Sequence, residues 1–303
     1  MAQSPSTLAT AGGAGQPAPV VRIVSQRQRA WRTFRKNRSA LFGLALIALL
    51  LVIAVFAPFI APHDPLAQST IQKLRPPSAD HWLGQDLYGR DLFSRIIYGT
   101  RVALLVGVLS VVLGGVLGTA IGITAGYFGG KVESLLMRIV DIMLAFPDLI
   151  TGLLVMAVLG AGMDKLILAI GLTITPRFAR IAYGPTLGLK EKEFVEAARA
   201  LGQGNTKILA KHILPNVVSE LIVLASLWTA SAIRLEASLS FIGLGVPPPT
   251  PTWGQMIRDG TVYLSDKPLL SLAPGVALLI AVFAFNLVGD GLRDVLDPRS
   301  SRN

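Results

Sequence analysis

The sequence predicts an all-α, polytopic membrane protein with six transmembrane helices. Of its 303 residues, 52% are hydrophobic and only 15% are charged, which leaves too little polar surface for an ordinary water-soluble protein. The apolar residues are grouped in runs that approach the ~20 residues needed to cross the hydrocarbon of a bilayer. The expected spans are residues 41–61, 101–125, 134–160, 165–183, 217–241 and 269–289.

The charges beside the first apolar run predict the orientation of the chain. Residues 22–38 contain Lys and Arg but no Asp or Glu, and a basic flank is typical of the cytosolic side of a span. The run that follows is longer than the core of a signal peptide, so we expect a retained helix, with cleavage as the alternative. Alternation through six spans then predicts that both termini and residues 184–216 are cytosolic.

These observations divide the chain into six segments. The first twenty or so residues are rich in Ala, Gly, Pro, Ser and Gln, which is typical of a disordered tail. The expected organisation is a disordered cytosolic tail (1–21), a basic cytosolic flank (22–40), a first transmembrane helix (41–61), an extracytoplasmic segment (62–100), a five-helix core (101–290) with a polar loop at 190–216, and a cytosolic tail (291–303).

The most informative segment is the charged block EFVEAARALGQGNTKILAKHILPN, residues 193–216, which separates two apolar runs. Its apolar residues Phe194, Ala197, Ala198 and Leu201 recur at helical spacing and predict a short amphipathic helix. The small alanines would let the surface of another protein approach closely, which indicates a docking site. The alternative is an ordinary solvated linker.

The residues that follow predict a sharp turn and a second helix. Gly202 and Gly204 can adopt a positive φ and end the first helix, and Asn205 can cap the second. Pro215 is expected to end that helix before the next span. The block is therefore predicted to be helix, turn, helix.

The block resembles the signature of the permease subunits of bacterial ATP-binding-cassette importers. That signature is Glu-Ala-Ala, three residues, Gly, nine residues, then Ile-x-Leu-Pro, and only His212, in the place of the isoleucine, departs from it. Four further blocks resemble the second, C-type permease subunit of dipeptide, oligopeptide and nickel importers. These blocks are residues 81–104, 141–150, 235–254 and 285–299.

The resemblance implies a type I importer permease fold and a coupling role for the charged block. In such importers two permease subunits pair, two cytosolic ATPases grip their coupling loops, and an extracytoplasmic binding protein delivers the cargo. The residues expected to couple to the ATPases are Phe194, Glu196, Ala197, Ala198, Leu201, Gly202, Leu214 and Pro215.

The chain itself is expected to bind no cofactor, with ATP and Mg²⁺ held by the partner ATPases. The nearest match to a phosphate-binding loop has Ala125 in place of its first glycine and Val132 in place of Ser or Thr. The three histidines, His63, His81 and His212, are scattered and match no compact metal-ligand spacing, so no metal site is predicted. No GxSxG motif is present, and a non-catalytic transport subunit is expected.

The other expected contacts are with membrane lipid, and the expected location is the bacterial plasma (inner) membrane. The net charge of +10 lies beside the apolar runs, so nucleic acid is not an expected partner. The cargo is expected to be a dipeptide or oligopeptide. Nickel or another small solute is the alternative, and an ATP-independent secondary transporter or channel is a further one.

Two groups of residues inside the spans have predicted roles. Small residues every fourth position predict a face for close helix packing, formed by Ser110, Gly114, Gly118, Gly122 and Gly126. Charged residues are costly inside a membrane, so they indicate either a polar pathway or structural pairing. The candidates are Asp148, Glu220, Arg234 and Glu236. Arg138 and Asp141 are expected to form a local ion pair or a snorkelling pair, with a proton relay as the alternative.

Overall fold

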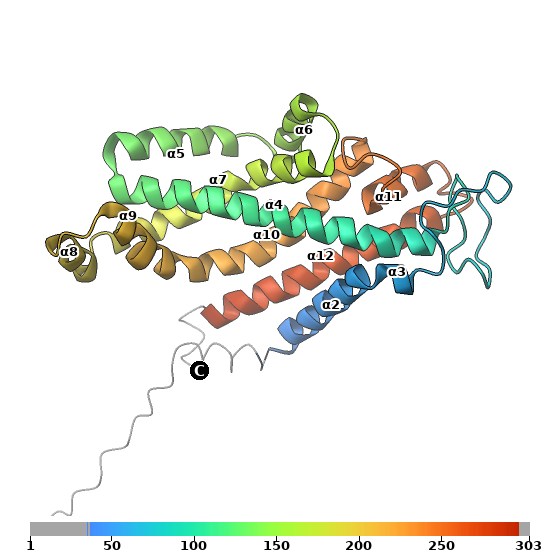
Figure 1. The fold of residues 1–303 in the computed structure, drawn as a ribbon, viewed down its shortest axis with the longest axis horizontal. Coiled ribbons are helices and arrows are strands. Elements are labelled where there is room, and N and C mark those ends of the chain that lie inside the picture. The colour runs from blue at the N-terminus through green and yellow to red at the C-terminus, as the bar shows by residue number, and fades with distance from the viewer. Residues whose placement is uncertain (1–34, 36, 297–303) are drawn as a thin grey trace, which may run out of the picture.

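The computed structural model describes residue 35 and residues 37–296, and within this part of the chain the fold is helical, with no β-strand (Figure 1). The expected tail at 1–21, nearly all of the basic flank before residue 37 and the last seven residues lie outside the described residues. The helices are α2 (Arg38–Val55), α3 (Ala57–Ile60), α4 (Leu92–Phe128), α5 (Gly130–Leu144), α6 (Asp148–Leu159), α7 (Met163–Leu189), α8 (Glu193–Ala200), α9 (Asn205–Ile208), the π-helix η1 (Leu209–Ile213), α10 (Leu214–Ile242), α11 (Trp253–Thr261) and α12 (Leu269–Leu296).

The described residues contain five helices that are long and apolar enough to cross a membrane, and a sixth crossing if α5 and α6 count as one broken span. The all-α class with multiple spans is therefore confirmed. The span expected over residues 134–160 is broken into two helices, because α5 and α6 meet at 98°. A residue before proline is biased away from the helical conformation, so the helix ends at Leu144 and restarts after Pro147.

The second span begins earlier than residue 101. Asp91 caps α4, and its side chain accepts a hydrogen bond from the backbone nitrogen of Ser94 at 2.7 Å. With 37 residues, α4 is about 56 Å long, which exceeds the ~30 Å of bilayer hydrocarbon. The helix therefore projects from the membrane, and its first turns belong to the segment that the sequence places outside the span.

The centre of the bundle is the parallel pair α4 and α7, which is the most extensive helix contact in the structure. The small residues of α4 face α7: a Cβ on Gly114 would lie 2.6 Å from the Gly171 carbonyl oxygen, and one on Gly118 would lie 2.6 Å from the Cβ of Phe178. Ser110 Oγ donates to the Ile167 carbonyl at 3.2 Å. The face formed by Ser110, Gly114, Gly118, Gly122 and Gly126 thus lies where the two backbones approach closely.

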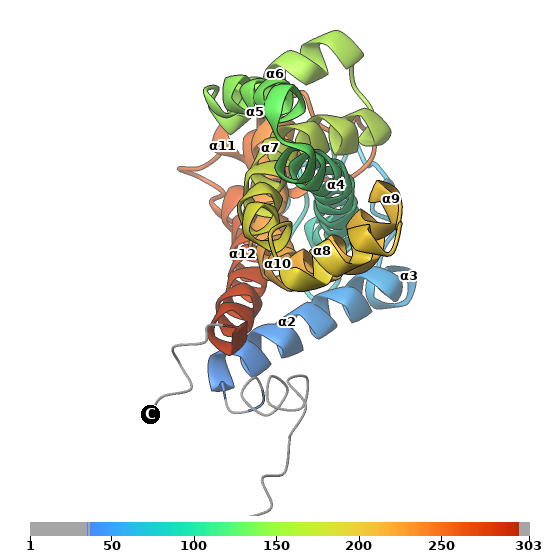
Figure 2. The ribbon, with the colours of Figure 1, turned by 90° about the vertical axis from the view of Figure 1, so that its left-hand side faces the viewer.

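Three further helices complete the bundle around this pair (Figure 2). Helix α10 packs on both α4 and α12, and α2 packs on α12. The start of α2 and the end of α12 meet, because Asn37 Nδ2 donates to Asp294 Oδ2 at 3.1 Å. Both described ends of the chain therefore lie together.

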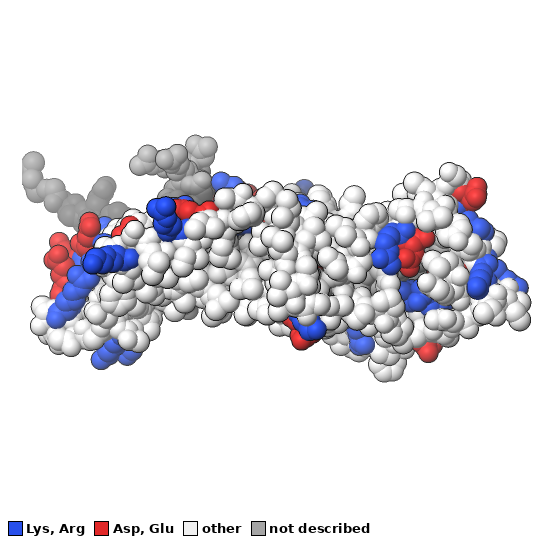
Figure 3. Space-filling view, turned by 90° about the horizontal axis from the view of Figure 1, so that it is seen from above, with Lys and Arg blue, Asp and Glu red and all other residues white. Residues whose placement is uncertain are grey.

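Charged side chains gather toward the two ends of the elongated molecule, and the middle of the face in Figure 3 is mostly uncharged. Large apolar side chains such as Val116, Leu154 and Leu279 are at least 57% exposed in this structure of a single chain. A belt of exposed apolar residues between two charged ends matches a bilayer with water on both sides.

Candidate functional site

The charged block, residues 193–216, forms a projection at one end of the bundle that we call the knob; α8 lies beyond the ends of α4 and α7, and α9 lies beside the end of α4 (Figures 1 and 2). Helix α8 has Glu193 and Glu196 in its first turn and Arg199 in its last, an arrangement that complements the helix dipole. The knob is joined to α10 through the π-helix η1. Movement of the knob would therefore act directly on a membrane span.

The inner face of the knob is fixed to the bundle. Val195 and Ala198 of α8 are 0% and 4% exposed and belong to the main apolar core. Tyr127, near the end of α4, donates its hydroxyl hydrogen to Asn205 Oδ1 at 3.0 Å. The Arg199 guanidinium carbon lies over the Tyr127 ring, 5.0 Å from the ring centre. Two short helices are thereby attached to the cytosolic end predicted for α4.

The outer face of the knob is apolar where the rest of its surface is charged. Phe194 is 42% exposed and Leu201 is 81% exposed, and the exposed Ala197 lies between them on α8. Exposed large apolar side chains outside the membrane are typical of a protein interaction surface. We call Phe194, Ala197 and Leu201 the outer stripe.

Ala198 does not belong to this outer stripe. The sequence places it with the docking residues, but the structure turns it inward beside Val195, because the helix presents residues 195 and 198 to the bundle. A bulky side chain at Ala198 would therefore first disrupt the chain's own core. Among the other expected coupling residues, Glu196 and Pro215 are exposed and Leu214 is partly buried.

The turn after α8 depends on one glycine. Gly202 has φ +73°, whereas Gly204 has φ −66° and precedes α9 in an extended conformation. The expectation that Asn205 caps α9 is wrong, because Gly204 is the N-cap and Asn205 is the first helical residue; the Asn205 side chain accepts from Tyr127 instead. Pro215 lies in the first turn of α10, where a missing backbone N–H costs nothing, so it does not end the preceding helix.

His212 stands where the importer signature has an isoleucine, and in the structure the next residue, Ile213, makes the apolar contact instead. Ile213 is fully buried in the main core. His212 is partly exposed, and its Nε2 lies 3.1 Å from Gln203 Oε1. The apolar contact thus comes from residue 213, and the histidine joins η1 to the turn after α8.

A second candidate site is a hollow of ≈ 180 Å³ between α6, α7 and α10, whose lining is part apolar and part polar. We call it the polar hollow after the charged side chains in its lining. Asp148 and Arg234 both line it, together with Ser231 and Ser238. Asp148 Oδ1 pairs with Arg177 Nη2 of α7 at 2.6 Å, and the Arg177 guanidinium lies 4.6 Å from the centre of the Trp228 ring. Asp148 therefore both forms an ion pair with Arg177 and lines the polar hollow.

The other two pathway candidates lie elsewhere. Glu236 is 1% exposed and accepts a hydrogen bond from Ser240 Oγ at 2.7 Å within α10. Glu220 is exposed on α10, roughly four helical turns before Arg234. Among the hollows found in the described part of the chain, the one at Asp148 contains Arg234 but neither Glu220 nor Glu236, so the four candidates are not gathered in it.

Two arginines of α7 were missed by the sequence analysis. Arg177 pairs with Asp148, and Arg180 pairs with Asp141, whereas the described residues show no ion pair between Arg138 and Asp141, both of which are exposed. The signal was present, because a cation in a span requires a partner and Asp141 and Asp148 lie in the preceding span.

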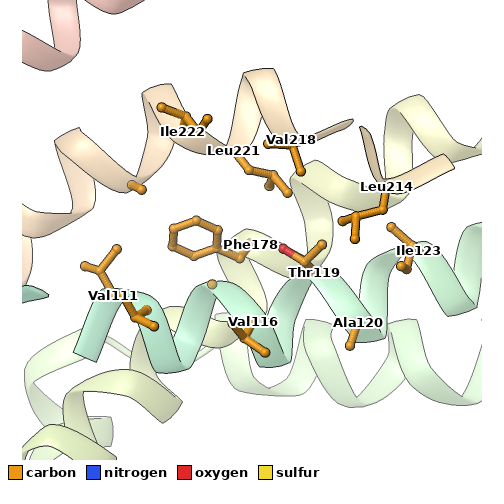
Figure 4. Close-up of a pocket in the computed structure, with 13 residues that line it drawn as sticks. Val111, Val116, Thr119, Ala120, Ile123, Phe178, Leu214, Val218, Leu221 and Ile222 are labelled. Atoms are coloured by element: carbon orange, nitrogen blue, oxygen red, sulfur yellow. The ribbon is translucent and has the colours of Figure 1, made fainter. Parts of the chain in front are cut away.

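A larger hollow of ≈ 470 Å³ lies between α4, α7 and α10 (Figure 4). It is lined by apolar side chains such as Val111, Phe178 and Leu221, and Thr119 is the one polar side chain in its lining. A surface of this kind suits lipid chains or an apolar helix, and not a charged solute.

Together, the crossing helices, the knob with its outer stripe and the polar hollow define a membrane-embedded transport subunit. The family described as binding-protein-dependent transport system inner membrane component matches residues 118–302, more than half of the chain. The N-terminal TM domain of oligopeptide transport permease C matches residues 25–77. The chain therefore belongs to the binding-protein-dependent inner membrane permeases, as a C-type permease of an ATP-binding-cassette importer.

Individual relatives agree with this assignment. The chain is 40% identical over 276 residues to the dipeptide transport system permease protein DppC of Alkalihalophilus pseudofirmus, with 91% of each chain covered. It is 42% identical over 270 residues to the glutathione transport system permease protein GsiD of Escherichia coli, with 89% of each covered. These relatives are transport permeases, and the resemblance read from the sequence is confirmed.

The fold is also similar to that of a solved transporter. A chain of the inward-facing MetNI methionine ABC transporter matches with a TM-score of 0.56 and 21% identity, covering 68% of this chain and 98% of that one. A second crystal form of that transporter gives a TM-score of 0.54. The shared fold is that of an importer permease.

Proposed function

We propose that this chain forms, with a second homologous permease subunit, the membrane pathway of an ATP-driven importer. In this proposal two cytosolic ATPases bind ATP and Mg²⁺ and grip the knob, and an extracytoplasmic binding protein supplies the cargo. The chain catalyses no covalent step. Its part is to change which side of the membrane the pathway faces when the ATPases move the knob.

The outer stripe is the observation that supports the coupling role best. The inner face of α8 is held by Tyr127 and the core, while Phe194, Ala197 and Leu201 remain exposed. An anchored helix with an apolar outer face can take up a partner and transmit its movement to α10 through η1. A solvated linker would need neither feature.

For the cargo, we propose a dipeptide or another short peptide. The relatives are named for dipeptide and glutathione transport. The polar hollow carries the carboxylate of Asp148, which also pairs with Arg177, and the guanidinium of Arg234 in its lining, so groups of both charges lie beside a solute that enters it. Uptake of a nickel complex or another solute without peptide uptake would contradict this part of the proposal.

The test compares a Trp substitution in the knob with one in the segment expected on the other side of the membrane. Ala197→Trp adds bulk to the outer stripe, and Ala67→Trp makes the same change at an exposed position of the expected extracytoplasmic segment. With the ATPases and binding protein present, Ala197→Trp should insert normally but lose the ATPases or the stimulation of ATP hydrolysis together with uptake. Ala67→Trp should retain the ATPases.

A second variant tests the turn. Gly202→Val places a β-branched residue at φ +73°, where no atom of the described residues outside the adjoining chain lies within 4 Å of an added Cβ, so the strain comes from the backbone conformation. We expect transport to fall, with the membrane subunits still paired. Wild-type uptake and stimulated hydrolysis in both Ala197→Trp and Gly202→Val would show that the knob is only a linker. Transport by a preparation free of ATPases would instead support a secondary transporter.

A further inference from the structure

Three residues that are distant in the sequence converge beside the start of α4. His63 follows α3, His81 lies in the loop that leads to α4, and Asp91 caps α4. The His81 Nδ1 lies 2.9 Å from Asp91 Oδ1, and the His63 Nδ1 lies 3.9 Å from the same oxygen. The three possible ligand atoms lie within 4.8 Å of one another.

The donor set suits a transition metal. Two imidazole nitrogens and one carboxylate oxygen are the ligands that Zn²⁺ and its first-row neighbours take, whereas Mg²⁺ and Ca²⁺ prefer oxygen. The cluster is open on one side, because the His63 side chain is 37% exposed while that of Asp91 is 1% exposed. Three protein ligands and an accessible side leave room for water as a fourth ligand.

The ligands are held in place by neighbouring groups. The second oxygen of Asp91 accepts from the Ser94 backbone nitrogen at 2.7 Å. The His63 backbone nitrogen donates to Ser94 Oγ at 3.1 Å, and the His81 backbone nitrogen donates to Ser78 Oγ at 3.1 Å. The two imidazole rings lie against each other with centres 4.4 Å apart. Such outer contacts orient the ligands of metal sites.

A hydrogen-bonded His81–Asp91 pair alone does not account for His63. Its Nδ1 is buried and has no hydrogen-bond partner among the described residues, although it faces the Asp91 carboxylate. A buried polar atom without a partner is unfavourable. A cation between the three groups would satisfy that nitrogen and replace the proton between His81 and Asp91.

The distances are close to those of a coordinated ion. Ligand atoms about 2.0–2.1 Å from a tetrahedral Zn²⁺ are separated from each other by about 3.3 Å. The separations of the two histidine nitrogens from the Asp91 oxygen, 2.9 and 3.9 Å, lie on either side of that value, and the two histidine ligand atoms lie within 4.8 Å of each other. Movement of the His63 and His81 rings would be needed to complete the geometry.

We propose that His63, His81 and Asp91 bind one divalent transition-metal ion of the zinc class. The ion joins the chain after α3, the loop around residue 81 and the start of α4. It thereby fastens the segment between the first two membrane spans to the bundle. The site is separate from the outer stripe and the polar hollow, and it does not depend on the identity of the cargo.

The experiment uses the full-length chain, purified with a histidine-free tag, stripped with chelator and dialysed against ZnCl₂. Wild type should retain one Zn²⁺ per chain and unfold at a higher temperature when zinc is present. His63→Gln and His81→Gln should each bind zinc at least about tenfold more weakly. His212→Gln removes the third histidine of the chain, which lies in the knob, and should bind zinc like wild type.

Two further measurements distinguish loss of a metal ligand from misfolding of a variant. Asp91→Asn keeps an effective helix cap but loses the carboxylate charge, so it should fold and bind zinc more weakly. Co²⁺ added to wild type should give the visible absorption of a low-coordinate site with nitrogen and oxygen ligands. Equal zinc binding by wild type and a folded His63→Gln/His81→Gln double variant would overturn the proposal, as would the absence of a Co²⁺ spectrum in wild type.

Discussion

At the scale of single residues, the glycines of α4 set the distance between the two central helices. Gly114, Gly118 and Gly122 each leave no space for a side chain, because an added Cβ would meet the backbone of α7. Without side chains between them, the two helices gain close van der Waals contact, which drives helix association in lipid where the hydrophobic effect is absent. A methyl group at these positions would force the helices apart.

This leads to a prediction that compares two glycines of α4, one packed against the backbone of α7 and one with more space around it. Gly122→Ala places a methyl group against the Ala179 carbonyl and 2.9 Å from the Cβ of Ala182, so it should lower stability by about 1–3 kcal/mol. Gly115→Ala makes the same change on the same helix, where the nearest atom is 3.5 Å away in the Phe178 ring. Thermal unfolding in detergent should separate the two. Equal melting temperatures for both variants would contradict the close packing of α4 and α7.

At the scale of helices, polar contacts attach the broken span to α7. Glu133 and Asp141 of α5 contact Tyr183 and Arg180, and Asp148 of α6 contacts Arg177. The partners on α7 are spaced by three, so they lie on one face of that helix. Two of these contacts come from α5, before the bend, and one comes from α6, after it. Both halves of the broken span are therefore held against α7.

The pair at the bend can be tested with a double-mutant cycle. The Asp148 and Arg177 side chains are 35% and 26% exposed, between a surface pair and a buried pair, so breaking the contact should cost about 1–2 kcal/mol. Asp148→Asn should destabilise wild type but have little further effect in an Arg177→Gln background. Glu220→Gln, at an exposed position of α10, serves as the control. Additive effects of the two changes would show that the pair makes no energetic contribution.

The sequence allowed the number of apolar segments to be predicted, but not their breaks. Run length and composition were sufficient for the spans, since both follow from the thickness of the bilayer. The bend at Pro147 was hidden because the apolar residues continue through it, and kinked helices are also compatible with proline. The early start of α4 required the recognition of Asp91 as a cap, which a polar loop of many Asp and Arg residues obscures.

The sequence predicted the outer stripe better than the histidine cluster, because local periodicity is visible in a sequence and long-range contacts are not. Phe194, Ala197 and Leu201 belong to one short helix, so local periodicity identified them as a surface. Ala198 was misplaced because periodicity does not indicate which side of a narrow stripe faces the bundle. The convergence of His63 and His81 on Asp91 depends on how a long loop folds back on α4, and no local spacing encodes it.

At the scale of the whole molecule, one contact and the order of the membrane crossings relate the described ends of the chain to the knob. Asn37 of the α2 cap binds Asp294 near the end of α12, so both described ends share one side. Two crossings, α4 and the broken span of α5 and α6, lie between α2 and α7, and α7 leads directly into the knob. If α5 and α6 together make one crossing, the two ends and the knob lie on the same side of the membrane, and the basic flank predicts that this side is the cytosol.

The native chain has no cysteine, so single introduced cysteines can test this arrangement. Asp80 and Ser265 are exposed in the loops at the opposite end from the knob, and Thr206 is exposed in α9. We expect a membrane-impermeant maleimide to label Asp80→Cys and Ser265→Cys in intact cells, and to label Thr206→Cys only after the membrane is permeabilised. Each variant should retain wild-type uptake, which ensures that the labelled protein is correctly inserted. Labelling of Thr206→Cys in intact cells would place the knob outside, beyond the reach of cytosolic ATPases. Failure to label Asp80→Cys in intact cells, with labelling after permeabilisation, would mean that α2 does not cross the membrane in the proposed direction.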